Sequence, residues 1–196
     1  MGKVGTGFSM SLDGFIAGPG DDVQQVFKWF FSGDTEVKYP GGRVVVKVSP
    51  ASAELLWEQI EMTGALVTGR RQFDLTYGWG GRHPLDVPVF VVTHPVPQEW
   101  VKEGSPFTFV TDGVESAVEQ AKAVAGDKNV VVDGANIAQQ CIKAGLVDEI
   151  GIDLVPALLG DGVRFFDHLD AEPIELESTR VIDAPGVTHL RYRIVK

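Results

Sequence analysis

Two short turns in this sequence carry residues suited to binding phosphate groups. The first, Asp133-Gly134-Ala135-Asn136, follows the apolar run at residues 130–132 and leads into a helical pattern that begins at Ile137. A small residue at a strand-to-helix turn lets a phosphate approach the backbone, and the free N–H groups and positive dipole end of the helix favour the anion. An ordinary tight connection without a ligand is the alternative.

The second turn contains two adjacent cations. The apolar run at residues 65–67 leads through Thr68 and Gly69 to Arg70 and Arg71, where another helix is predicted to begin. Arginine offers a planar fork of donors that suits phosphate oxygens. A solvated basic pair is the alternative interpretation. Two such turns in one chain favour a dinucleotide ligand, whose phosphates need cradles at neighbouring strand ends.

The surrounding pattern predicts the elements that position these turns. Short apolar runs predict strands at residues 4–10, 44–48, 65–68, 89–93, 107–110, 130–132 and 150–155, and helical spacing predicts helices at 23–31, 49–60, 112–121 and 137–144. Residues 11–22 and 77–87 are predicted to be loops. Residues 174–182 and 187–195, separated by Asp183-Ala184-Pro185-Gly186, predict an antiparallel hairpin at a sheet edge.

Length and charge narrow the classes of protein. The 196 residues, 44% of them hydrophobic, are consistent with one domain spanning residues 1–196. The net charge is −10, and most of the acidic excess lies in the second half of the chain. Such a surface repels nucleic acids and anionic membranes, so we expect neither as a partner.

Other motifs exclude several kinds of chemistry. The single cysteine, Cys141, lies on the apolar face of its predicted helix, which favours a buried structural thiol over a catalytic one. The four histidines show no metal-ligand spacing, and neither a Gly-x-Ser-x-Gly elbow nor a Gly-x-x-x-x-Gly-Lys loop occurs, so we expect no metal and no hydrolase. No apolar stretch approaches the roughly 18 residues of a membrane span, and we expect a cytoplasmic protein.

Four motifs occur in an order that resembles a known family. They are residues 8–17 (FSMSLDGFIA), the turn at 68–71 (TGRR), residues 88–93, and the run from Gly145-Leu146-Val147-Asp148-Glu149 to Pro156-Ala157-Leu158-Leu159-Gly160. Together they resemble the dihydrofolate-reductase-like family that includes the reductase domain of riboflavin biosynthesis, the RibD C-terminal domain. The resemblance implies a three-layer α/β/α fold with a mixed, mostly parallel sheet, a homodimer, and NADPH as cofactor.

The resemblance also implies roles for residues outside the two turns. Ser9, Ile16 and Ala17 would line the nicotinamide side, under a lid formed by residues 11–22. Thr93 and His94 would lie near the adenosine ribose and its phosphate. By the same resemblance Asp161 would border the substrate pocket. Trp79, an aromatic in a glycine-rich loop, is a candidate for stacking on a substrate ring, with a packing role as the alternative.

The catalytic acid is not identified by the sequence. Folate reductases carry a carboxylate on the helix after the lid loop, and here that segment contains Gln24 and Gln25. Asp21, Asp22 and Asp161 are the remaining candidates, although acids at a helix start more often act as caps. A second departure is Ala135, where the family often has glycine. Alanine is tolerable there only if its φ is negative.

We therefore expect an NADPH-dependent reductase that resembles 5-amino-6-(5-phosphoribosylamino)uracil reductase and transfers hydride to a small heterocyclic or ribosylamine substrate. A dihydrofolate or pteridine reductase is one alternative. A non-catalytic nucleotide-binding dimer that kept the fold is another. Fold analogy alone does not decide among them.

Overall fold

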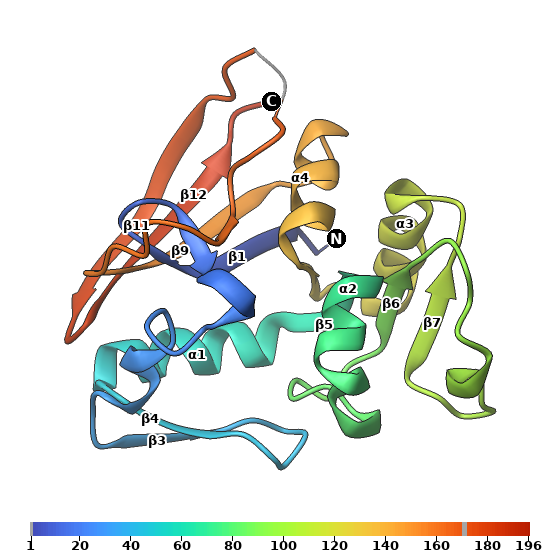
Figure 1. Ribbon diagram of the computed structural model, residues 1–196, viewed down its shortest axis with the longest axis horizontal. Helices are drawn as coiled ribbons and strands as arrows, with labels where there is room; N and C mark the ends of the chain where they lie inside the picture. The colour runs from blue at the N-terminus through green and yellow to red at the C-terminus, as the bar shows by residue number, and fades with distance from the viewer. Residues whose placement is uncertain (1, 170–171) are drawn as a thin grey trace.

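The computed structural model describes residues 2–169 and 172–196 (Figure 1). Its centre is an eight-stranded sheet in the order β11-β12-β9-β1-β8-β5-β6-β7. Neighbouring strands from β9 to β7 run parallel, whereas β11 and β12 form an antiparallel hairpin at one edge. The predicted mixed, mostly parallel sheet with a C-terminal hairpin is confirmed. The strands are β1 (Val4–Ser11), β5 (Thr63–Gly69), β6 (Val89–Val92), β7 (Phe107–Val110), β8 (Asn129–Asp133), β9 (Glu149–Val155), β11 (Leu176–Ala184) and β12 (Val187–Ile194).

Four α-helices cover the two faces of this sheet. They are α1 (Pro50–Met62), α2 (Arg70–Leu75), α3 (Val114–Ala125) and α4 (Ala135–Lys143) (Figure 1). Alternate side chains of β5 divide between the faces, because Ala65 and Val67 pack with α3 and α4 whereas Leu66 packs with Phe73 of α2. The three layers expected from the resemblance are present.

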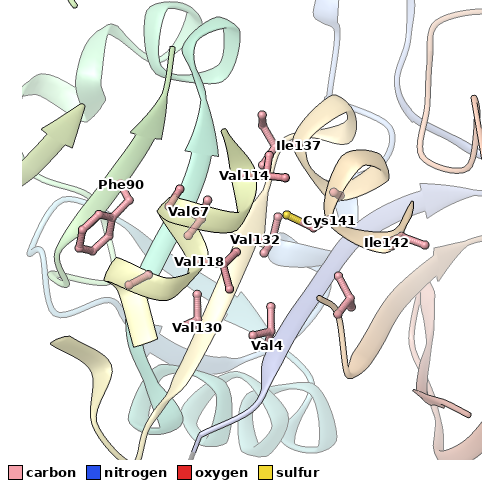
Figure 2. Close-up of a cluster of buried hydrophobic side chains, with 14 of the residues drawn as sticks. Val4, Val67, Phe90, Val114, Val118, Val130, Val132, Ile137, Cys141 and Ile142 are labelled. Atoms are coloured by element: carbon pink, nitrogen blue, oxygen red, sulfur yellow. The ribbon is translucent and has the colours of Figure 1, made fainter. Parts of the chain in front are cut away.

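The larger core lies between the sheet and the helices α3 and α4. Figure 2 shows Cys141 among Val132, Ile137 and Val114 in this cluster. The thiol is completely buried, and burial, together with the nearby charge of Glu115, raises the pKa of Cys141 to about 12. The predicted structural thiol is therefore confirmed as a buried, protonated group.

The predicted helix at residues 23–31 is wrong. The segment forms turns followed by the short 3₁₀ helix η2 (Lys28–Phe31), which is closed by bonds such as Phe30 N–H to Phe27 C=O. Trp29 belongs to this helix and Val26 to the turn before it, and both side chains are buried. Tertiary packing of these two side chains, rather than helical spacing, decides the conformation.

Small elements interrupt the segments predicted as loops. Within residues 11–22, β2 (Phe15–Ala17) pairs with β10 (Val163–Arg164), and η1 (Pro19–Asp21) follows it. A second ribbon joins β4 (Val45–Val48), which was predicted, to β3 (Thr35–Lys38), which was not. The remaining short helices are η3 (Tyr77–Gly81) and η4 (Gln98–Trp100).

A buried polar network joins α1 to the hairpin side of the sheet. The imidazole of His189 lies 2.9 Å from Oγ of Ser52 through Nε2 and 2.7 Å from Oδ1 of Asp153 through Nδ1. Arg191 donates to the same carboxylate oxygen at 2.9 Å. Because Ser52 and His189 are almost entirely buried and line no described cavity, the network cross-links the fold rather than presenting a nucleophile.

Candidate functional site

A cleft of about 1120 Å³ lies at the carboxyl ends of the parallel strands. Residues from the ends of β1, β5, β6 and β8 line it, including Ser9, Gly69, Val92 and Asp133. This is the edge at which open α/β sheets bind ligands. The volume lies just above the range of roughly 300–1,000 Å³ usual for ligand pockets.

The two predicted turns lie side by side in this cleft. Thr68 and Asp133 are register partners in the pairing of β5 with β8, so Gly69 and Gly134 follow at the same sheet edge. Gly134 has φ +91, a conformation that favours glycine. Ala135 is the first residue of α4 and has no positive φ, which is the condition under which alanine is tolerable at this position. Gly69 has an ordinary φ of −92, but a Cβ there would lie 2.8 Å from Cγ1 of Ile137. Glycine at position 69 therefore lets α4 pack against the turn.

Thr68 supplies a buried polar atom without a partner. Its side chain is fully buried, and Oγ1 is the one buried side-chain N or O atom of the described residues that makes no hydrogen bond. A Cβ on Gly134 would lie 3.9 Å from this hydroxyl and 3.9 Å from the backbone N of Gly69. An unsatisfied buried hydroxyl costs free energy unless a ligand or water meets it, so its presence beside the glycine turn indicates a polar occupant.

The two arginines both line the cleft and both meet carboxylates. Arg70 donates from Nε to Asp74 at 2.7 Å and from Nη1 to the carbonyl oxygen of Pro95 at 3.1 Å. Nη2 of Arg71 lies 2.7 Å from both carboxylate oxygens of Asp21, which belongs to the predicted lid. The two side chains are 33% and 66% exposed, so the pair is neither fully solvated nor buried.

Asp133 is an acid within the phosphate turn. Its Oδ1 accepts a hydrogen bond from the Gly134 N–H at 2.9 Å. Burial raises the pKa of Asp133 to about 6, although this hydrogen bond opposes the shift. With a pKa of about 6 the carboxyl is still mostly ionised at pH 7, so its repulsion of an anion is relieved only as the pH falls below about 6.

The opposite end of the cleft is more apolar. Phe8, Ile16, Ala17 and Phe27 form its walls together with the hydroxyl-bearing Ser9. The indole Nε1 of Trp29 donates to Oγ of Ser9 at 2.9 Å, so the side chain of Ser9 has a fixed position. A flat ring beside a single polar group is the kind of ligand that such walls accommodate.

Most of the residues predicted for the cofactor are brought together here. Those that line the cleft are Ser9, Ile16, Ala17, Gly69, Arg70, Arg71, Thr93, His94, Asp133, Gly134, Ala135, Asn136 and Ile137, with Thr68 buried beneath them. Among the candidate acids, Asp21 lines the cleft beside Arg71. Asp22 lies outside it and accepts a hydrogen bond from the Gln24 N–H at 2.9 Å.

The two residues predicted for the substrate, Trp79 and Asp161, are not among the residues that line the cleft. Trp79 packs in an aromatic cluster, 4.6 Å from the ring of His83 and 6.3 Å from that of Phe73. It lies in a left-handed run, with φ +49 beside Gly78 and Gly80, and its ring is partly buried against the cluster that contains Phe73 and Phe107. Asp161 is exposed and accepts a hydrogen bond from the Gly162 N–H. The geometry favours the packing role that was the alternative for Trp79.

Several lining residues were missed by sequence reasoning. Thr111 and Gly113 follow β7, so their place at the carboxyl edge could have been inferred from the strand pattern. Phe27 was assigned to a helix that does not form. The others, which only the fold brings to the cleft, are Phe8, Val23, Gln72, Leu75, Thr76, Val92, Pro95, Gln139, Gln140, Val163, Arg164, Asp167 and His168.

The sheet order, the three layers and the cleft at the carboxyl edge define a dihydrofolate-reductase-like α/β protein. Within this class, the chain belongs to the RibD C-terminal domain family, which it matches over residues 3–188. The chain is therefore a RibD C-terminal, reductase-like domain. The comparison with curated proteins gave no match.

Solved structures support the fold. A protein from Shewanella sp. PV-4 assigned to riboflavin biosynthesis has a TM-score of 0.73 at 23% identity, with 99% of each chain covered. Enterococcus faecalis dihydrofolate reductase, complexed with NADP(H), gives 0.59 at 16% identity, over 99% of this chain and 97% of that one. The Thermotoga maritima diaminohydroxyphosphoribosylaminopyrimidine deaminase/5-amino-6-(5-phosphoribosylamino)uracil reductase gives 0.64 at 14% identity, over 99% of this chain and 57% of that one.

The described residues contain neither a membrane-spanning helix nor a metal-site cluster. No helix there has the length and hydropathy needed to cross a membrane. No group of three or more His, Cys, Asp or Glu side chains in that part of the chain has the arrangement of a metal site.

Proposed function

We propose that this protein is an NADPH-dependent reductase that transfers hydride to a small heterocyclic or ribosylamine substrate, in the manner of 5-amino-6-(5-phosphoribosylamino)uracil reductase. The observation that carries the proposal is the pairing of Thr68 with Asp133, which joins the two phosphate-type turns into one cradle. Family membership supports the class of reaction.

The residues at the cradle fit the phosphates of a dinucleotide. Thr68 offers a buried hydroxyl that lacks a partner, and Gly134 leaves open the space in front of it. The first N–H groups of α4 have no acceptor within their own helix, and the helix dipole favours an anion at that end. Arg70 and Arg71 would hold phosphate oxygens at the rim. These residues would bind and orient NADPH, and the cofactor would supply the hydride.

The apolar end of the cleft would orient the reacting ring. Ile16 and Ala17 would lie against the nicotinamide and exclude water, while the Ser9 hydroxyl would meet a polar group of a ligand. In this scheme the protein contributes positioning, and a solvent water or a substrate group supplies the proton.

A ribosylamine or similar substrate is favoured over a pteridine. Gln24 and Gln25 are exposed and lie outside the cleft, so the segment that carries the pterin-binding acid in folate reductases presents no carboxylate to the described cavity. Of the carboxylates that do line it, Asp21 is paired with Arg71 and Asp133 belongs to the phosphate turn. Asp167 accepts a hydrogen bond from its neighbour, the His168 N–H.

The decisive experiment is a titration of the protein with NADPH and NADH, by calorimetry or tryptophan fluorescence, at low and moderate salt. We expect tighter binding of NADPH that weakens with salt, because surface arginines and phosphates are screened. Arg70→Ala/Arg71→Ala should weaken NADPH binding and reduce its salt dependence. Turnover with a panel of ribosylamino-pyrimidines and pteridines then separates the two substrate classes. Absence of binding to either nucleotide would overturn the proposal, whereas binding without turnover of any substrate would favour the non-catalytic alternative.

We also propose a cytoplasmic homodimer. β11 is an edge strand with most of its side chains exposed, including Val181. Exposed edge strands are ready templates for pairing with another chain. Analytical ultracentrifugation should show a dimer at micromolar protein, and a monomer at that concentration would contradict this part of the proposal.

A further inference from the structure

The tip of the lid reaches across the cleft to one of the two arginines. The tip consists of residues 18–22, which include η1, and its Asp21 carboxylate places both oxygens 2.7 Å from Nη2 of Arg71. Within the described part of the chain, this ion pair is the sole side-chain hydrogen bond from residues 19–21 to α2. The tip is thus held over the cleft through the guanidinium that the proposed function assigns to phosphate.

The backbone of the tip is built to present this carboxylate. Gly20 and Asp21 are both left-handed, with φ +71 and +61, and the Gly18 N–H donates to the carbonyl oxygen of Asp22 at 2.7 Å to close the turn. Aspartate tolerates this conformation better than most residues that carry a side chain.

The base of the lid is anchored independently of the tip. β2 pairs with β10, and a Cβ on Gly162 would lie 2.0 Å from the Ala17 carbonyl oxygen, so only glycine permits this close approach. The guanidinium of Arg164 also lies 4.4 Å from the centre of the Phe15 ring. Loss of the ion pair at the tip would therefore leave the base of the lid in place.

We propose that Asp21 is an internal competitor for Arg71: its carboxylate occupies the guanidinium until a phosphate group of the nucleotide replaces it. This inference rests on the proposed function, and it assigns to Asp21 control of cofactor affinity rather than the role of catalytic acid. A carboxylate and a phosphate oxygen use the same N–H donors of an arginine, so both cannot be fully bound at once. The 2′-phosphate of NADPH is a monoester with a charge of about −1.5 to −2 at pH 7, more than the single charge of the carboxylate, so it displaces Asp21 from the guanidinium.

The competition is modest because the pair is partly exposed. The side chain of Arg71 is 66% exposed and that of Asp21 is 28% exposed, so solvent screens their attraction. Removal of the carboxylate charge should tighten NADPH binding by about two- to fivefold, which corresponds to the range measured for exposed ion pairs.

The test measures the NADPH dissociation constant of four variants and of the unmodified protein at low salt. Asp21→Asn removes the charge and keeps a side chain that tolerates a positive φ. Asp22→Asn is the matched control, because it changes the net charge equally at the adjacent position outside the cleft. Arg71→Ala and the double variant Asp21→Asn/Arg71→Ala complete a thermodynamic cycle. Thermal melting of each variant verifies that it is folded.

We expect Asp21→Asn to bind NADPH about two- to fivefold more tightly than the unmodified protein. Asp22→Asn should bind NADPH with the affinity of the unmodified protein. The double variant Asp21→Asn/Arg71→Ala should bind NADPH with the same affinity as Arg71→Ala alone. Unchanged NADPH binding by Asp21→Asn would overturn the inference. Weaker binding would also overturn it, because it would show that Asp21 stabilises the bound nucleotide. The same tightening in the Arg71→Ala background would also overturn it, as a general effect of charge. If the unmodified protein binds no NADPH, the proposed function fails together with this inference. If it binds NADPH but Asp21→Asn does not bind it more tightly, only this inference fails.

Discussion

The indole Nε1 of Trp29 donates a hydrogen bond to Oγ of Ser9 at 2.9 Å, and both side chains are buried. The bond connects the short helix η2 to the end of β1 at the apolar end of the cleft. On its other side the indole packs edge-on against the His189 ring at a centroid distance of 5.0 Å. Trp29 therefore positions Ser9, and through it one wall of the proposed nicotinamide site.

This bond predicts a measurable coupling between the two side chains. Ser9→Ala leaves a buried indole N–H without an acceptor, which should cost about 1–3 kcal/mol of unfolding free energy. Trp29→Phe removes the donor and some packing. Because both variants break one bond, the double variant Ser9→Ala/Trp29→Phe should be less destabilised than the sum of the single effects, as measured by urea denaturation. Additive effects would show that the bond contributes nothing to stability.

Thr68→Val should weaken NADPH binding without lowering the thermal stability of the protein. The hydroxyl that it removes has no partner, so the melting temperature should stay the same or rise slightly. The affinity for NADPH should fall if this hydroxyl meets a phosphate. The control is Thr6→Val on β1, whose hydroxyl donates to the Val132 carbonyl oxygen at 2.8 Å. That variant should be less stable and bind NADPH normally, and the opposite pattern would contradict the role given to Thr68.

Asp133→Asn should change stability in a pH-dependent way. The pKa of Asp133 is raised in the folded state, from 3.8 to about 6, by burial. A carboxyl with a raised folded pKa stabilises the fold when protonated, and this contribution is lost as pH rises through about 6. The asparagine variant should therefore melt a few degrees higher than the unmodified protein at pH 7, with the difference disappearing below about pH 4. Melting curves from pH 4 to 8 provide the measurement, and a difference independent of pH would show that burial does not perturb this group.

Cys141 should be unreactive in the folded protein. The thiol is fully buried and burial raises its pKa to about 12, so the reactive thiolate is scarce at neutral pH. Ellman's reagent at pH 8 should label no thiol in the native protein and one thiol per chain in guanidinium chloride. Rapid native labelling would indicate that α4 opens locally.

The strand framework and much of the cleft could be predicted because they depend on local patterns. Apolar runs identified the parallel strands, and polar or glycine residues after them marked the carboxyl edge, where Gly69 and Gly134 indeed lie together. The segment at residues 23–31 could not be predicted, since its apolar spacing suits either an α-helix or the 3₁₀ turn in which Trp29 reaches Ser9. Trp79 was equally ambiguous, because an aromatic in a glycine loop suits a pocket or a packing site.

The sequence by itself determined the family, the order along the chain of the eight strands of the main sheet and of the α-helices between them, and the glycine at position 134, because these follow from residue types in consecutive positions. Only the tertiary structure decided which side chains meet across the cleft. The contact of Asp21 with Arg71 joins residues 50 positions apart, and the hydroxyl of Thr68 is without a partner only because β5 and β8 bury it together. Such contacts depend on how strands pair and helices pack, so they cannot be predicted from the spacing of residues along the chain.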